Sequence, residues 1–94
     1  MNTILQTNYL MISQQVSLNN SSAVKIISSV NYEQTINAHN SSGNNMYLGG
    51  SDVSTSNGFH LPNNTDVVIR VQQDNELWGI MATGTGSIHV LRPD

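Results

Sequence analysis

The strongest structural signal in this chain is the segment Val67-Val68-Ile69-Arg70-Val71. Successive side chains of a β-strand point to opposite faces of its sheet, so Val67, Ile69 and Val71 are predicted to face inward. Val68 and Arg70 are then predicted to face solvent. Strands also favour β-branched residues, which dominate this segment. We therefore predict a strand with one buried face.

Segments with the same two-residue period lie on both sides of this strand. In residues 35–39, Ile36 and Ala38 share a face, and the other such segments are residues 15–18, 24–26, 77–82 and 87–91. Runs rich in Asn, Ser and Gly separate them, and these residues favour turns. No stretch after residue 14 keeps a helical period. We therefore predict an all-β fold, a small antiparallel β-sandwich or jelly-roll-like barrel of seven or eight strands.

The composition indicates a folded domain of low charge. The 94 residues are enough for one domain, and Asn, Ser and Thr supply about a third of them. Charged residues make up 10%, against about 25% in typical soluble domains. Ile, Leu, Val and Phe together exceed the content of about 20% below which chains tend to be disordered. With a net charge of only −3, the chain does not repel itself open.

Several classes of function are excluded by what the sequence lacks. The three basic residues, Lys25, Arg70 and Arg92, are scattered, whereas nucleic-acid binding needs clustered positive charge. The longest apolar run is four or five residues, far below the roughly 20 that cross a bilayer. Without cysteine there is no disulfide, thiolate zinc site or cysteine nucleophile. We therefore expect neither a nucleic acid nor a membrane as a partner.

The first thirteen residues differ from the rest of the chain. Their apolar side chains fit neither the helical nor the strand period, which leaves a short helix, a first strand or an extended arm that packs on a neighbour. We predict the last of these, with residues 1–13 as an N-terminal arm and residues 14–94 as a single β-sandwich domain. A domain this small buries only about 60–65% of its unfolded surface, which favours association with itself or with a larger partner. The arm is predicted to contact that partner through its apolar residues Ile4, Leu5, Leu10 and Ile12.

Three histidines, His39, His60 and His89, are the first candidates for metal binding. Their spacing contains no His-x-x-x-His pattern. His39 and His89 are predicted at strand ends or outward strand positions, and His60 in a loop. We expect polar surface histidines, with neither a metal site nor a cofactor. Trp78 lies among apolar residues of a predicted strand and is expected in the core.

No arrangement of residues favours catalysis, so an enzyme is not expected. A serine with a histidine and an aspartate would supply a catalytic triad, but twelve serines make such a combination an accident of numbers. Asp74 and Glu76 could act as paired carboxylates, but they flank a predicted hairpin turn, which explains them as solvated turn residues. Residues 83–86 lack the third glycine of a dinucleotide-binding loop and are predicted to form a β-turn.

The second half of the chain carries a longer pattern. It consists of MYLGGSDVSTSNGFHL at residues 46–61 and LWGIMATGTGSIHVL at residues 77–91. This pattern resembles a family of small tailed-phage virion proteins, in which a strand ending v-Y-L-G precedes x-x-V-T-x-x-x-G-x-P-L and then L-W/Y-x-I-x-x-x-G-x-x-x-V-x-V-L. Residues 36–42, INAHNSS, are similar to the family's I-x-N-x-S strand and turn. The resemblance covers roughly residues 16–92 and leaves the arm unmatched.

The resemblance implies a structural virion protein, with capsid decoration or cement as the leading hypothesis. Such a protein would bridge and stabilise coat subunits on the capsid surface. The implied partners are the major capsid protein or other virion proteins, together with copies of this chain, most simply as a trimer. Polar loops would add contacts beside the arm, and the loop residues predicted to make them are Asn40, Asn44, Asn45, Ser51 and Asn57.

The alternative hypothesis is a neck, fibre or tail accessory domain that takes part in attachment. Such a domain would recognise host glycans through polar loops beside exposed aromatic side chains. Tyr32 and Tyr47 are the candidates for such aromatic platforms.

Overall fold

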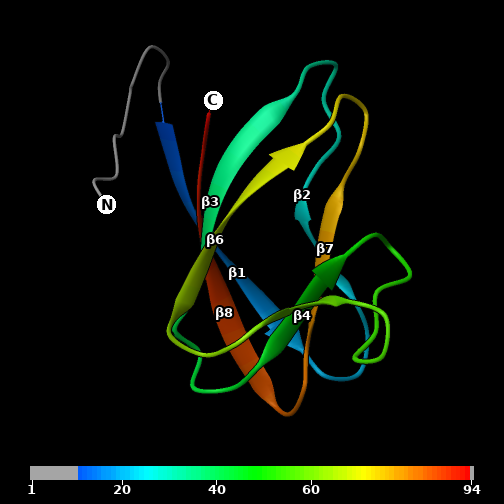
Figure 1. Cartoon of the computed structure of the whole chain (residues 1–94), viewed down its shortest axis with the longest axis vertical. Coiled ribbons are helices and arrows are strands. Elements are labelled where there is room, and N and C mark those ends of the chain that lie inside the picture. Colours follow the sequence, from blue (N-terminus) through cyan, green and yellow to red (C-terminus); the bar gives the residue numbers. More distant parts are fainter. Residues whose placement is uncertain (1–10, 94) are drawn as a thin grey trace.

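The computed structural model describes residues 11–93, and within this range it contains eight β-strands and no helix (Figure 1). The all-β fold and the number of strands predicted from the sequence are therefore confirmed. The strands are β1 (Met11–Asn19), β2 (Val24–Ile27), β3 (Gln34–Asn40), β4 (Met46–Gly49), β5 (Phe59–Leu61), β6 (Thr65–Val71), β7 (Leu77–Met81) and β8 (Thr85–Pro93).

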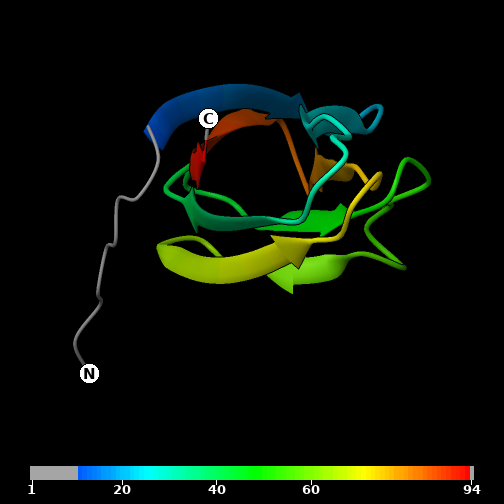
Figure 2. The same ribbon diagram turned by 90° about the horizontal axis from the view of Figure 1, so that it is seen from above.

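The strands form two four-stranded antiparallel sheets. Sheet A has the order β1-β8-β3-β6 and sheet B the order β2-β7-β4-β5. The pairs β1–β8, β2–β7, β3–β6 and β4–β5 follow one another as a long antiparallel ribbon of two strands, which is rolled up. The rolling brings β3 beside β8 and β4 beside β7, and these two further pairs complete the sheets. Eight strands connected in this way form a jelly roll. Figure 2 shows the strands wrapped around the core.

Both sheets contribute to one core. Ile36 and Ala38 of β3 are fully buried, as the two-residue period predicted. Val71 of β6 is also buried, while Val67 and Ile69 are partly buried and pack against the core. The outward positions of β6 are exposed, again as predicted. The largest fully buried apolar side chains come from both sheets: Leu18, Ile36 and Ile88 from sheet A, and Met46 and Met81 from sheet B.

Gly79 shows how closely the two sheets approach one another. A Cβ atom at this position would lie 2.8 Å from Cδ1 of Ile26 and 3.0 Å from Cδ1 of Leu18. A glycine in the middle of a strand weakens the strand, but here it makes room for core side chains from both layers. Its position also fixes the orientation of β7, because its strand neighbours Leu77 and Met81 face the core with it.

The orientation of β7 corrects the prediction for Trp78. Since Gly79 faces the core, Trp78 and Ile80 point to the outer side of sheet B. Ile80 is nevertheless buried there, together with Val53 from residues 50–58, the segment that connects β4 to β5. Trp78 is only half-buried. Hydrophobicity alone predicted a core position for the indole, but alternation places it on the outer side of sheet B.

The connection between β6 and β7 is a second correction. The sequence predicted a hairpin around Asp74 and Glu76, but β6 belongs to sheet A and β7 to sheet B, so residues 72–76 cross between the layers. Asp74 has a left-handed φ of 67° and donates its backbone N–H to the carbonyl of Val30 at 2.8 Å. β7 and β8 also belong to different sheets, and the short segment of residues 82–84 connects them, with Gly84 at φ 64°. The chain therefore bends within the turn predicted at residues 83–86, but residues 85 and 86 already belong to β8.

Candidate partner-binding surface

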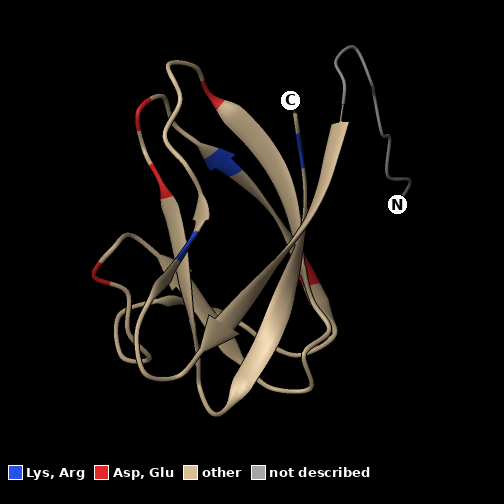
Figure 3. Ribbon diagram, turned by 180° about the vertical axis from the view of Figure 1, so that it is seen from behind, with Lys and Arg blue, Asp and Glu red and all other residues tan. Residues whose placement is uncertain are grey.

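The longest free edge of the described structure belongs to β1. This nine-residue strand pairs with β8 over its whole length, from Met11↔Pro93 to Asn19↔Thr85, and it is the outermost strand of sheet A. It contains no charged residue and no proline, and Figure 3 shows its ribbon without charge along its length. A free edge presents unpaired N–H and C=O groups that another strand can bind. We call residues 11–19 the β1 edge.

The other three sheet edges are shorter or carry charge. β6, at the opposite side of sheet A, bears Asp66 and Arg70 on its exposed face. In sheet B the edge strands β2 and β5 have only four and three residues, and β2 contains Lys25. Charge and short length are the usual ways in which proteins block edge pairing. Among residues 11–93, the β1 edge is thus the one best suited to pairing with another chain.

The outer face of sheet A adjoins the β1 edge and is hollowed. The strand register aligns Gln15, His89, His39 and Asp66 in one row across all four strands. The next row consists of Ser13, Leu91, Asn37 and Val68, and the side chain of Val68 is 62% exposed. The hollow is lined by Ser13, Gln14, Gln15, Asn37, Ala38, His39, Asp66, His89, Val90 and Leu91.

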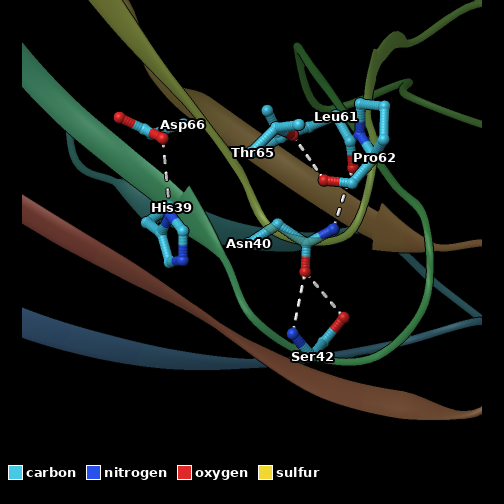
Figure 4. Close-up of polar contacts among 7 residues, drawn as sticks. All are labelled: His39, Asn40, Ser42, Leu61, Pro62, Thr65 and Asp66. Atoms are coloured by element: carbon cyan, nitrogen blue, oxygen red, sulfur yellow. Dashed lines mark hydrogen bonds and ion pairs between the residues drawn. The ribbon is translucent and has the colours of Figure 1, made fainter.

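The histidines of this row lie as the sequence predicted, on outward positions of their strands. Nδ1 of His39 lies 3.6 Å from Oδ1 of Asp66 (Figure 4). The prediction for His60 is wrong, because this residue lies in β5 and stacks on Tyr47, with ring centroids 5.1 Å apart. Within residues 11–93, no group of three or more His, Cys, Asp or Glu side chains is placed to hold a metal ion.

Asn40, one of the predicted partner contacts, is an internal brace. Its side chain is fully buried at the end of β3. Its Nδ2 donates to the carbonyls of Leu61 and Asn44, each at 2.8 Å, and its Oδ1 accepts from the backbone N–H and the hydroxyl of Ser42 (Figure 4). Because these bonds join the end of sheet A to the end of β5 in sheet B, Asn40 holds the fold together and its side chain is not free to contact a partner.

The other predicted loop residues are exposed. Asn57 braces its own loop, since its Oδ1 accepts the backbone N–H of Ser54 at 2.7 Å and its Nδ2 donates to the carbonyl of Asp52 at 3.2 Å. Asn44, Asn45 and Ser51 also lie at the surface. These positions belong to two different loops, residues 41–45 and 50–58, and their roles as partner contacts stay predictions.

The residues of the predicted arm fall into two groups. β1 begins at Met11, so residues 11–13 belong to the sheet and not to a separate arm. Ile12 lies opposite Arg92 in this strand. Ile4, Leu5 and Leu10 lie outside the described residues. The last three residues of the predicted arm, 11–13, are thus part of β1.

A small polar cluster lies on the outer side of sheet B, at the start of β7. The indole N–H of Trp78 donates to Oε1 of Glu76 at 3.0 Å, and Nζ of Lys25 lies 3.3 Å from Oε2 of the same carboxylate. The Lys25 ammonium also lies 5.9 Å from the centre of the indole ring. The hydrogen bond from Trp78, and then the Lys25 ammonium, hold the pKa of Glu76 below its ordinary value.

The row across sheet A escaped the sequence analysis because it depends on register. Gln15, Asp66 and the two histidines come from four strands, and nothing in the local sequence says which strands are neighbours. The alternation of β3 and β8 did predict that His39 and His89 point outward. What was missing was the pairing β3–β8, a contact between strands that are distant in the sequence.

The comparisons with known proteins add little to these observations. No family model matches the sequence, and neither does any curated protein. Among solved structures, a chain of the disulfide-linked pili described as Bacillus endospore appendages is similar, with a TM-score of 0.46 and 10% identity over 99% of this chain and 96% of that one. A similarity this distant assigns neither a function nor a partner. Within residues 11–93, no helix is long and apolar enough to cross a membrane.

Proposed function

We propose that this chain is a structural protein of a tailed-phage virion that binds the outside of the capsid and stabilises the contacts between coat subunits. The observation that carries the proposal is the β1 edge, nine uncharged residues at the side of sheet A. An edge of this length allows a strand of a neighbouring subunit to extend the sheet through backbone hydrogen bonds. The capsid protein and further copies of this chain, most simply as a trimer, are the partners we expect.

Two further properties support a role in assembly. Charged residues make up only 10% of the chain while Asn, Ser and Thr are abundant, so an interface formed by this surface would be polar, wet and little affected by salt. The jelly roll is also an architecture that viral capsid domains use, although the same fold serves lectins. The resemblance of residues 46–61 and 77–91 to small virion proteins supports a place on the virion, and the capsid is the position we take as the leading hypothesis.

The test measures binding to capsids that lack the protein. Ser17→Lys places a charge on the exposed face of the β1 edge, and Thr35→Lys places the same charge on the exposed face of β3, a central strand of the same sheet. We expect the purified protein to sediment with the capsids and to raise their melting temperature. The Ser17 variant should lose most of this binding, while the Thr35 variant should keep it.

Removal of residues 2–10 distinguishes the contribution of the β1 edge to capsid binding from that of the residues before it. If the edge alone binds the capsid, the truncated chain decorates capsids as the full chain does. If the apolar residues Ile4, Leu5 and Leu10 bind as well, the occupancy falls. Full binding by the Ser17 variant together with full binding by the truncated chain would overturn the proposal.

A second candidate function, attachment to host glycans, is favoured by the exposed aromatic residues near β5. Phe59 is 58% exposed, and the adjacent His60 stacks on Tyr47. Aromatic faces of this kind pack against sugar rings. A glycan array probed with the wild-type chain and with Tyr47→Ala distinguishes the two functions, since a signal that the substitution abolishes would favour attachment. Absence of signal beside normal capsid decoration would reject this candidate.

A further inference from the structure

We propose that His39 and His89 form a binding site for a divalent transition-metal ion on the outer face of sheet A. This site is independent of the β1 edge and does not require the chain to be a virion protein. Its protein ligands are the two imidazoles, and water completes the coordination. The carboxylate of Asp66 orients one of the imidazoles without binding the ion.

The strand register brings the two imidazoles together. His39 on β3 lies directly opposite His89 on β8 in an antiparallel pair. Their strand neighbours Ala38, Asn40, Ile88 and Val90 are all buried, so both histidines project to the outer face. Opposite residues of an antiparallel pair have Cβ atoms about 4.5–5.5 Å apart. Two imidazoles at this spacing can bind one ion at the usual metal–nitrogen distance of about 2.0–2.1 Å.

Asp66 is placed to fix the orientation of His39. Its Oδ1 lies 3.6 Å from Nδ1 of the imidazole, and Figure 4 shows the other ring nitrogen on the side away from the carboxylate. Metal-binding histidines typically direct one ring nitrogen to a carboxylate and bind the ion with the other. The carboxylate of Asp66 therefore lies on the Nδ1 side of the ring, and Nε2 of His39 is the nitrogen left to bind the ion.

The surroundings of the pair suit a hydrated ion. The hollow of sheet A lies over both histidines and is bordered by Gln15 on the far side of His89 and by Asn37 beside His39. These amide side chains can bind the water molecules of a partly hydrated ion. His39 is partly exposed and His89 is exposed, so an ion can enter without any movement of the chain.

The number of ligands predicts the kind of ion and the strength of binding. Two imidazoles suit Cu²⁺, Ni²⁺ and Zn²⁺, whereas Mg²⁺ and Ca²⁺ require sets of oxygen ligands. No third His, Cys, Asp or Glu of residues 11–93 is placed to join them, so we expect weaker binding than in sites with three or four protein ligands.

The charged groups that face the pair come from the neighbouring strands. β6 supplies Asp66, the closest carboxylate, and β1 contributes the neutral Gln15 in the same row. The ion would thus enter a row that holds one negative charge and two imidazoles.

The test is a titration of the full chain with Zn²⁺ and Ni²⁺, followed by calorimetry and by backbone amide NMR spectra. Paramagnetic Ni²⁺ should broaden the signals of residues 13–15, 37–40 and 87–91 first. His39→Ala and His89→Ala should each reduce the affinity at least about tenfold, and Asp66→Asn by about tenfold. His60→Ala removes the remaining histidine and serves as the matched control, because that residue lies on sheet B and should not affect the affinity.

Three results would overturn the site. The first is absence of Zn²⁺ and Ni²⁺ binding at neutral pH, and the second is unchanged binding in both His39→Ala and His89→Ala. The third is broadening centred on His60 or on the N-terminal residues. The amide spectra of the variants also show whether each one is folded, and we expect them to be, since both side chains lie outside the core.

Discussion

The two sheets of this jelly roll share one core, yet their outer faces differ. On sheet B, residues 50–58 fold back over the outer face, and Val53 and Ile80 are buried there with 6% and 8% of their surface exposed. On sheet A, the outer face is bare within residues 11–93, and Val68 is 62% exposed. The covered face is a second packing surface, whereas the bare face and its β1 edge are available to a ligand or partner.

Strand length follows the same division. Sheet A contains strands of seven and nine residues, while those of sheet B have three to five. Long strands produce more rows of side chains that run across all four strands, such as the row that contains His39 and His89. Short strands leave room for the loop that crosses them. The comparison therefore predicts that similar substitutions have unequal effects on the two outer faces.

The largest effect is expected at Asn40, which joins the two sheets. Asn40→Ala leaves the buried carbonyl of Leu61 and the carbonyl of Asn44 without their side-chain donor, at a cost of about 2–4 kcal/mol in the free energy of unfolding. Asn37→Ala, on the bare outer face of the same strand, should change it by less than about 0.5 kcal/mol. Urea unfolding measures both. Equal losses in the two variants would contradict the role of Asn40 as a brace.

A smaller loss is expected at Gly58, where the loop meets sheet B. A Cβ atom here would lie 2.7 Å from Cβ of Tyr47 and 2.8 Å from Cγ2 of Val53. Gly58→Ala must therefore push the loop off the sheet, and we expect a destabilisation of about 1–3 kcal/mol. Gly50→Ala is the control in the same loop, because its Cβ atom would meet only Oδ1 of Asp52, at 3.4 Å. If thermal unfolding showed the two variants to be equally stable, the close packing of the loop would be refuted.

The third prediction compares the two outer faces with one pair of identical substitutions. Val53→Ala removes two buried methyl groups from the covered face, which should cost about 1–2 kcal/mol. Val68→Ala removes the same atoms from the bare face and should cost less than about 0.5 kcal/mol. The difference between the two free energies of unfolding measures how firmly the loop covers sheet B. A larger loss at Val68 would mean that the bare face is covered in solution, for example by a second copy.

The strands could be predicted from the sequence alone because a strand with one buried face alternates apolar and polar residues. The alternation put Ile36 and Ala38 on one face of β3 and turned Val71 of β6 inward, and the structure buries all three. It also put His39 and His89 at the surface, where the structure has them. Which strands are neighbours is a different kind of information. It depends on contacts between distant segments, and for this reason the β6–β7 connection was wrongly predicted as a hairpin.

The residues that sequence analysis misjudged show the same limit. Asn40 lies in a polar run typical of an exposed turn, but the crossing from sheet A to sheet B buries it among backbone carbonyls. Trp78 lies in an apolar run typical of the core, but the need for a glycine at position 79 turns the indole outward. In both cases the arrangement of the layers decided the environment, and local composition could not have revealed it.

The smallest effect is expected at Glu76, which shows how the outer side of sheet B depends on pH. Because Trp78 and Lys25 hold its pKa below the ordinary value, the charged form of Glu76 stabilises the folded chain above the pKa of the unfolded state. This contribution is lost as the pH falls through the lowered pKa of the folded state. Glu76→Gln should therefore reduce stability slightly at neutral pH and flatten its decline in the acidic range. Urea unfolding from about pH 7 to about pH 3 measures this, with Asp52→Asn in the same sheet's exposed loop as the control. Parallel pH profiles for wild type and Glu76→Gln would show that the contacts with Trp78 and Lys25 do not persist in solution.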